Sequence, residues 1–345
     1  MRRDIFIGDI HGCWHELQQL MAEVQLTDED RLISVGDLVD RGPHSVELWE
    51  FFRTRPNALV LMGNHERKHV RGVLSYSQEI VRVQFGARYE AFRAWARDLP
   101  YFIETPEIIA VHGGFEHGVP LDSQREDVLA ATTSGTKHLE KLYGDTYWPE
   151  LYEGSKPIVF GHHVVGDEPR VWNGRAYGID TGACHGGWLT ALVVPGFTLH
   201  RVKATRDHWR AEQKRWQVPV LRAKPWATFK YTKLERELAA VEHPRASADV
   251  HAFVAELRAW LAAVDALVEP LIERVEARRV ELQAAHQDRE LRRAIASEPC
   301  PALLFSSAAG SLTRASLVDQ LGSPAAILDA ARAYGLSSPG APPFA

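Results

Sequence analysis

The chain has 345 residues, of which 45% are hydrophobic, and a formal net charge of −5 at pH 7. A weakly acidic chain has no overall attraction to nucleic acid or anionic membrane, and no run approaches the roughly 18 apolar residues of a membrane span. Three scattered cysteines are too few for a disulfide framework, and the start, MRRDIFIGD, turns acidic too early for a signal peptide. We therefore expect a cytoplasmic protein with one large domain and an extension, and no membrane partner.

Short apolar runs in the first 180 residues predict strands, and each run leads into a glycine or a polar cluster. The runs are 5–7 before GDIHG, 31–35 before GDLVDRGP, 58–62 before GNHE, 107–111 before HGG, 157–160 before GHH and 176–180 before TG. Residues 14–24 and 43–52 have the apolar spacing of helices, with Pro43 suited to a first helical turn. Strands that alternate with helices predict an α/β fold, in which polar residues after the strands converge at one edge.

The residues that follow these strands offer oxygen and imidazole donors but no thiolate. They are Asp9, His11, Asp37, Asn64, His112 and either His162 or His163. Such donors suit divalent ions such as manganese, iron or zinc. The set is too large for one catalytic ion that must keep open coordination positions. It fits two ions that lie about 3.5–4 Å apart and share a bridging carboxylate, and such a pair promotes in-line displacement at phosphorus.

GDIHG, GDLVDRG, GNHE, HGG and GHH, in this order over roughly residues 3–203, resemble the calcineurin-like metallophosphoesterases. The chain is most similar to the phosphoprotein phosphatase branch, which includes bacterial serine/threonine phosphatases and diadenosine tetraphosphatases. The resemblance implies a four-layer α/β/β/α sandwich of two sheets flanked by helices. It also implies two divalent ions, with manganese favoured over iron or zinc.

The same resemblance implies a role for each ligand. Asp9 and His11 hold the first ion, Asp37 bridges both, and Asn64, His112 and His162 complete the second site. His162 is preferred to His163 because the family's ligand directly follows the glycine.

Residues beside the ligands match the family's catalytic groups. His65 matches the general acid, Asp40 the carboxylate that orients it, and Arg41 the fork that contacts phosphoryl oxygens. Lys137 lies about where many relatives carry a further phosphate-binding arginine, and it is either a substitute or a solvated surface lysine. His69 matches no ligand position and is expected to face solvent or to hydrogen-bond within a loop.

Two features of the sequence point to different substrates. Asp40 and Glu66 depart from the GDLVARG and GNHD of the tetraphosphatases, which favours a serine/threonine-phosphatase-like phosphomonoesterase acting on a phosphorylated protein or a small phosphoester. Residues 178–192 instead resemble the tetraphosphatases and the phosphatase modules of bacterial RNA-repair enzymes, so a nucleotide or RNA phosphoesterase is the alternative. A non-catalytic binding module is least favoured, because every expected ligand is present.

The composition changes beyond about residue 204. We expect the phosphoesterase domain over 1–204 and a basic connector with a mainly helical extension over 205–345, ending in a disordered tail from about 337. The connector carries Trp209, Trp216 and Trp226 among basic residues. These tryptophans are expected to pack on the catalytic domain, and the alternative is binding of single-stranded nucleic acid.

The extension has an apolar seam within a helical stretch over 247–295, which Pro270 should kink or split before the polar ELRRAIAS ends it. A further helix is predicted from Ser323-Pro324. The extension is expected to cover one side of the sandwich or to form a docking or dimerisation surface, whose partner the sequence does not identify.

Overall fold

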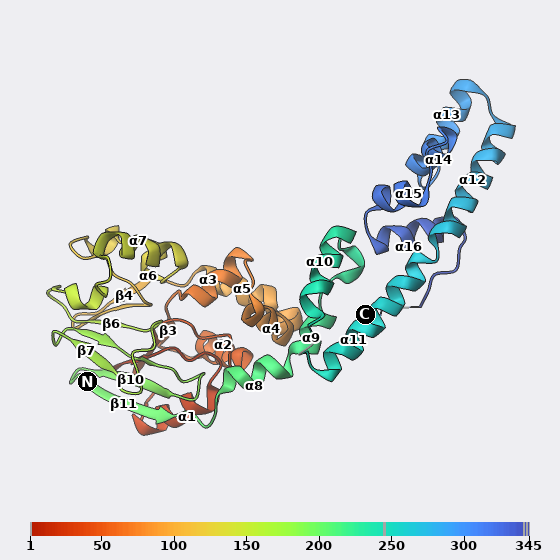
Figure 1. Cartoon of the computed structure of the whole chain (residues 1–345). Coiled ribbons are helices and arrows are strands. Elements are labelled where there is room, and N and C mark those ends of the chain that lie inside the picture. Colours follow the sequence, from red (N-terminus) through yellow and green to blue (C-terminus); the bar gives the residue numbers. More distant parts are fainter. Residues whose placement is uncertain (1, 244–245, 341, 343, 345) are drawn as a thin grey trace. The chain divides into compact units, whose positions relative to one another are not determined.

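The computed structural model describes residues 2–243, 246–340, 342 and 344 and divides into two compact units, Met1–Trp216 and Gln217–Ala345 (Figure 1). The first unit extends past residue 204 because α8 (His208–Arg215) is attached to it. His208 Nε2 lies 2.8 Å from Glu16 Oε1, and the Tyr76 hydroxyl donates to the Gln213 carbonyl at 2.8 Å. Within the described ranges, none of the helices combines the length and the apolarity that a membrane span requires.

Two β-sheets form the centre of the first unit. The first sheet has the order β11-β10-β1-β2-β3, from β1 (Asp4–Ile7), β2 (Arg31–Ser34), β3 (Ala58–Val60), β10 (Trp188–Val194) and β11 (Thr198–Lys203), and β9 (Asp180–Thr181) also pairs with β10. The second sheet has the order β4-β5-β6-β8-β7, from β4 (Phe102–Glu104), β5 (Ile109–Val111), β6 (Ile158–Phe160), β7 (Arg170–Trp172) and β8 (Ala176–Gly178). The strands β1, β2 and β3 are parallel to one another, as are β5, β6 and β8.

The alternation of side chains along β1 separates two layers of core. Phe6 is paired in register with Ile33 and packs in the cluster between the sheets, together with Val159 of the second sheet. Ile5 and Ile7 point the other way and pack in the cluster that buries the helices of the first sheet's outer face. These helices are α1 (Trp14–Glu23), α2 (Ser45–Thr54), α3 (Asn64–Arg71), α4 (Tyr76–Phe85) and α5 (Tyr89–Arg97).

The outer face of the second sheet is covered by α6 (Glu126–Leu129), α7 (Thr133–Tyr143) and the 3₁₀ turn η3 (Trp148–Leu151). Phe160 of β6 packs there with Leu129 and Trp148. The expected four-layer α/β/β/α sandwich is therefore confirmed. Because the parallel strands belong to two facing sheets, the polar clusters converge from both sheets and not along the edge of one.

One helix boundary differs from the prediction. The second helix begins at Ser45 with His44 as its N-cap, so Pro43 precedes the helix and does not lie in its first turn. The His44 N–H donates to the Gly12 carbonyl at 3.1 Å, which holds residues 42–44 in the loop beside the first polar cluster.

The second unit is helical and has its own core. Its helices are α9 (Gln217–Arg222), α10 (Tyr231–Val241), α11 (Ala248–Asp265), α12 (Val268–Ala285), α13 (Asp288–Ala296), α14 (Pro301–Ala308), α15 (Arg314–Leu321) and α16 (Pro324–Ala333). The predicted seam, including Leu257, Val264 and Leu271, is buried in a cluster formed by this unit alone. Trp226 is fully buried in the same cluster, so its ring is not available to stack on a nucleic-acid base.

Two local predictions about the extension are confirmed. The long helical stretch splits between α11 and α12, with Pro270 in the first turn of α12, and Ser323 caps α16 through its hydroxyl. ELRRAIAS does not end the stretch but forms α13, after a break at residues 286–287. Residues 336–340 have no regular secondary structure, and positions 341, 343 and 345 of the expected disordered tail lie outside the described residues.

Candidate metal centre

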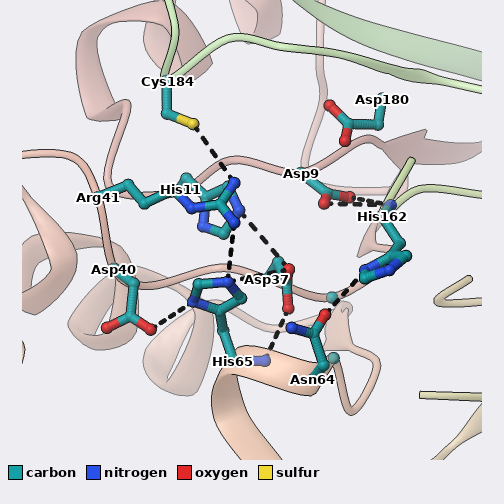
Figure 2. A network of polar contacts seen from close by, with 12 residues as sticks. Asp9, His11, Asp37, Asp40, Arg41, Asn64, His65, His162, Asp180 and Cys184 are labelled. Carbon is teal, nitrogen blue, oxygen red and sulfur yellow. Dashed lines mark hydrogen bonds and ion pairs between the residues drawn. The ribbon is translucent and has the colours of Figure 1, made fainter. Parts of the chain in front are cut away.

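The segments after β1, β2, β3, β5 and β6 bring all six predicted ligands together, and Figure 2 labels all of them except His112. The shortest approaches between their donor atoms are His162 Nδ1 to Asn64 Oδ1 at 2.9 Å, His112 Nε2 to Asn64 Oδ1 at 3.0 Å, His112 Nε2 to Asp37 Oδ1 at 3.4 Å and His11 Nε2 to Asp37 Oδ2 at 3.6 Å. The backbone N–H of His162 donates to both oxygens of Asp9, at 3.0 and 3.1 Å. The sequence predicts that these residues follow strands. The fold then shows that the ends of those strands lie close together.

The backbone of the centre is unusual for non-glycine residues. His11, Asp37, Asp40, Arg41 and His162 all have positive φ, at 45°, 50°, 73°, 64° and 67°. Such conformations cost on the order of 1 kcal/mol or more each and persist where the surrounding structure imposes them. This strain is concentrated in the loops that carry the predicted ligands and catalytic groups.

Glu66 supplies much of the constraint on these loops. Its buried carboxylate accepts hydrogen bonds from the backbone N–H groups of Asp37 at 3.0 Å, Leu38 at 2.9 Å, Val39 at 3.3 Å and Gly63 at 3.2 Å. One side chain therefore ties the loop that carries Asp37 to the start of α3. In the sequence analysis, Glu66 was used only to favour the serine/threonine-phosphatase-like branch over the tetraphosphatases, and this structural role was not predicted.

Two glycines before ligands are required by close packing. A Cβ at Gly161 would collide with Asp9 Oδ1, and a Cβ at Gly63 would collide with Asp37 Oδ1. The glycine of GHH and the glycine of GNHE thus let a neighbouring loop place its carboxylate against the chain.

The hydrogen bonds of two histidines test whether the centre suits a cation. Nδ1 of His11 lies 2.9 Å from the Val39 carbonyl and Nδ1 of His112 lies 3.0 Å from the Val35 carbonyl, so in the neutral rings these nitrogens carry the proton. Each Nε2 is then a bare lone pair facing Asp37. Nε2 of His11 is buried and has no hydrogen-bond partner among the described residues. The orphaned Nε2 of His11, and Nε2 of His112 between Asn64 Oδ1 and Asp37, fit a divalent cation.

The electrostatics lead to the same conclusion. Burial and the nearby Asp180 carboxylate raise the pKa of Asp9 well above its usual range. Burial opposes a charge on His112, but the Asp37 carboxylate outweighs burial and raises the pKa of His112 to about 10. Without a cation, the centre therefore favours protons on Asp9 and His112, while the pKa of Asp37 is held well below its usual range. Divalent ions would supply the same positive charge.

The donor atoms form two groups that share one residue. His11, Asp37 and His65 make one group and Asp37, His112 and His162 the other, each with its nitrogen and carboxylate atoms within 4.8 Å of one another. A shared Asp37 is the arrangement that two ions with a bridging carboxylate need.

The predicted catalytic residues lie on one side of this centre. His65 Nδ1 is 2.5 Å from Asp40 Oδ2, and Arg41 Nη2 is 3.1 Å from His65 Nε2. Arg41 Nη1 also lies 3.9 Å from the buried Cys184 sulfur. An imidazole, its carboxylate and a guanidinium therefore form a connected row beside Asp37 (Figure 2).

The prediction for His69 was wrong. It is fully buried, and its Nε2 lies 3.0 Å from Asp40 Oδ1 while its Nδ1 lies 2.9 Å from the Tyr89 hydroxyl. Gln78 also donates to Asp40. Burial alone would raise the pKa of Asp40, but His69 and His65 together hold it far below its usual range. The spacing was a usable signal, because His69 follows His65 by four residues and so shares its face of α3.

Sequence reasoning also missed Asp180. It is buried near Asp9 and Asp37, and its Oδ1 accepts a hydrogen bond from the Gly182 N–H at 3.0 Å. A signal was present, since Asp180 is the last residue of the predicted strand at 176–180 and precedes the Thr-Gly that ends it.

The remaining predicted residues lie in two cavities that both reach His162. Lys137, on α7, lines a cavity of about 530 Å³ together with Asn64 and His162. His163 lines a second cavity of about 520 Å³, where its ring centroid is 5.2 Å from that of Tyr147. His162 therefore lies beside Asn64, and His163 does not.

The chain is similar to several known proteins. The profile of the calcineurin-like phosphoesterases matches residues 4–183. The bis(5′-nucleosyl)-tetraphosphatase PrpE [asymmetrical] of Bacillus cereus (strain B4264) is 31% identical over 232 residues, covering 56% of this chain and 91% of that protein. A metallophosphoesterase structure from Sphaerobacter thermophilus is 18% identical with a TM-score of 0.38, covering 64% of this chain and 96% of that one. A protein serine/threonine phosphatase from Saccharomyces cerevisiae is 16% identical with a TM-score of 0.41, covering 59% and 79%.

Proposed function

Since the chain belongs to the calcineurin-like phosphoesterase family and is a hydrolase of phosphoester bonds, we propose that it cleaves a dinucleoside tetraphosphate at the metal centre described above. The observation that carries this proposal is the likeness to a curated tetraphosphatase over 91% of that protein's length. A likeness of this extent covers nearly the whole relative and not one shared motif.

The cavity beside His163 supports a nucleoside as part of the substrate. Tyr147 and His163 offer aromatic faces on which a base can stack, and Leu139 adds apolar surface. The cavity shares His162 with the cationic cavity that Lys137 lines, so a nucleotide and its phosphates can lie on either side of one ligand.

The proposed reaction is water plus dinucleoside tetraphosphate to nucleoside triphosphate plus nucleoside monophosphate, which is an asymmetrical cleavage; the relative is named as an asymmetrical tetraphosphatase. Two divalent ions, with manganese as our first choice, would withdraw charge from the phosphoryl group and lower the pKa of water. The residues that would hold these two ions are Asp9, His11, Asp37, Asn64, His112 and His162.

The other residues act on the phosphoryl group and the leaving oxygen. Arg41 is placed to contact two phosphoryl oxygens with its planar fork. In this structure His65 Nε2 accepts a hydrogen bond from Arg41, so His65 would protonate the leaving oxygen from Nε2 once Arg41 turns to the phosphoryl group and the ring takes up a second proton; Asp40, hydrogen-bonded to Nδ1, fixes the orientation of the ring. Both roles need only small movements of side chains that are already adjacent, at 3.1 Å between Arg41 and His65.

A second function is favoured by one specific observation. The hydrogen bond between Asp40 and His65 equips the site to protonate a strongly basic alkoxide, which is the leaving group of a phosphoserine and not of a nucleotide. A phosphomonoesterase acting on phosphoproteins is therefore the alternative.

A substrate panel separates the candidates. Purified, manganese-loaded protein would be given diadenosine tetraphosphate, a phosphoserine peptide and a 2′,3′-cyclic nucleotide at equal concentration. We expect the highest kcat/KM for the tetraphosphate, with ATP and AMP in equal amounts by anion-exchange chromatography. Faster release of phosphate from the peptide would replace the proposal by the phosphomonoesterase alternative, and preference for the cyclic nucleotide would indicate an RNA end-healing enzyme.

A further inference from the structure

One face of α3 continues from the metal centre as a row of cations. Asn64, a predicted ligand, is followed at the helical spacings of three, four and seven residues by Arg67, Lys68 and Arg71. All four residues line the cavity of about 530 Å³ that also reaches His162. From the opposite wall, α7 adds Lys137.

Arg67 is the inner end of this row. It is only 6% exposed, and neither its Nε nor its Nη1 has a hydrogen-bond partner among the described residues. Its Nη2 lies 3.9 Å from Glu126 Oε2, and its guanidinium lies 5.7 Å from the centroid of the Tyr101 ring. A buried guanidinium with free N–H groups is costly unless an anion completes it.

The other cations are also uncompensated. Within the described part of the chain, Lys68, Arg71 and Lys137 form no side-chain hydrogen bond or ion pair, and Glu140 is the one carboxylate among the residues that line the cavity. This concentration of positive charge occurs in a chain whose net charge is −5. The N-terminus of α7, an eleven-residue helix that begins at Thr133, adds its dipole to the same wall.

We propose that this cavity binds the phosphates of the substrate that are remote from the reacting phosphorus, through Arg67, Lys68, Arg71 and Lys137. Arg41 is not among its lining residues and lies with His65 and Cys184, so the reacting phosphoryl group and the remote phosphates have separate arginines. Successive phosphates of one chain are a compact, densely charged anion, which suits a partly enclosed cavity better than the more widely spaced carboxylates of an acidic peptide.

This inference rests on the proposed function, and its test uses a probe that does not depend on it. The probe is inorganic tripolyphosphate, used as an inhibitor of nitrophenyl phosphate hydrolysis with free manganese held constant. Orthophosphate, which reaches only the reacting position, is the reference inhibitor. Arg71→Ala and Lys68→Ala are the test variants, because both side chains are at least partly exposed and their loss leaves the core intact. Arg97→Ala, at an exposed arginine of α5 that lines neither cavity, is the matched control.

Each test variant should raise the inhibition constant of tripolyphosphate about tenfold, the usual scale for one charge-assisted hydrogen bond. The constant for orthophosphate should change much less, and Arg97→Ala should change neither. Arg67→Ala should have the largest effect, but the exposed variants decide the question should that protein fail to fold.

The possible results distinguish failure of the phosphate-binding proposal for the cavity from failure of the proposed function. If wild-type protein does not cleave diadenosine tetraphosphate but tripolyphosphate inhibition still depends on Arg71 and Lys68, the cavity is supported and the proposed function fails. If the tetraphosphate is cleaved and its KM is the same in all variants, the cavity proposal is overturned and the function stands. A rise in KM confined to an acidic phosphopeptide would also overturn it and would make the cavity a peptide site.

Discussion

His69 and Asp40 are joined by a buried contact of 3.0 Å between Nε2 and Oδ1, on the opposite side of the carboxylate from His65. Asp40 is thus held between two imidazoles, and the Tyr89 hydroxyl extends the row by 2.9 Å to His69 Nδ1. Because Asp40 orients the proposed general acid, a change at His69 should reach the reaction without touching the metal ligands.

The first prediction follows from this row. His69→Gln should lower kcat about tenfold, the lower end of the effects seen when a supporting hydrogen bond of a catalytic or metal-bound group is lost. KM and bound metal should stay close to wild type. Tyr89→Phe is the control, because it keeps the contact with Asp40 and should cost much less. A folded His69→Gln protein with wild-type kcat would show that Asp40 does not need its second imidazole.

The second prediction concerns the shared carboxylate. Asp37→Asn removes the charge that faces both His11 and His112, so it should reduce bound manganese and lower kcat/KM by roughly 10³-fold, since metal ions contribute several kcal/mol to such reactions. Elemental analysis of the purified protein measures the metal directly. Asp122→Asn, at an exposed position, should keep both properties, and an Asp37→Asn protein with full metal and activity would contradict the two-ion interpretation.

The third prediction separates proton donation from charge stabilisation. An alkoxide leaving group needs a proton far more than a nitrophenolate or the phosphate of a nucleotide. His65→Asn should therefore cut turnover of a phosphoserine peptide by about 10²–10⁴-fold and turnover of nitrophenyl phosphate and diadenosine tetraphosphate distinctly less. Arg41→Ala acts on the phosphoryl group itself and should affect all three alike. Equal losses on all substrates in His65→Asn, with metal content unchanged, would mean that His65 only shapes the site.

The fourth prediction concerns stability in acid. Burial opposes the charge on Glu16, but the hydrogen bond and charge of His208, together with backbone N–H groups that include that of Thr205, outweigh burial and lower the pKa of Glu16 from 4.5 to about 2. A folded-state pKa below the unfolded value means that the stabilisation is complete above about pH 4.5 and is lost as the pH falls toward 2. Between about pH 6 and pH 3, wild type should lose roughly 2 kcal/mol more of the free energy of unfolding than Glu16→Gln.

Urea unfolding of the first unit at both pH values measures this difference. Glu153→Gln, at an exposed glutamate, should follow wild type. If Glu16→Gln shows the same dependence on pH as wild type, the contact between Glu16 and His208 does not control acid stability.

The fifth prediction uses the separate cores of the two units. A chain that ends at Trp216 retains every predicted ligand and α8, which is attached through Glu16 and His208, and it should keep kcat/KM for nitrophenyl phosphate within about threefold of the full chain. Size-exclusion chromatography would report whether it stays monodisperse. Aggregation or loss of activity would mean that the first unit requires residues 217–345.

The convergence of the six predicted ligands could be expected because each lies within four residues after an apolar run, and this pattern is local. The hydrophobic periodicity indicated only an α/β fold. The packing of two sheets face to face was predicted from the resemblance to the family. His69 and Gln78 contact Asp40 from α3 and α4, and Tyr89 of α5 contacts His69. They were missed because the way three helices pack over a sheet cannot be inferred from the sequence of any one helix. Asp180 was missed although its position after a strand was visible. The partners of the seam at Leu257 and Leu271 lie in later helices of the same unit, so the sequence could show that the seam is buried but not where.

The left-handed backbone at His11, Asp37 and His162 has a consequence for the history of this protein. Glycine adopts such conformations freely, so replacing any of these side chains by glycine would relieve strain in the fold while removing a metal ligand. A descendant released from selection for catalysis could become more stable by drifting toward glycine at these positions. If these side chains hold the ions as proposed, they are kept for chemistry and not for folding, and a homologue that carries glycine at them should be more stable but inactive.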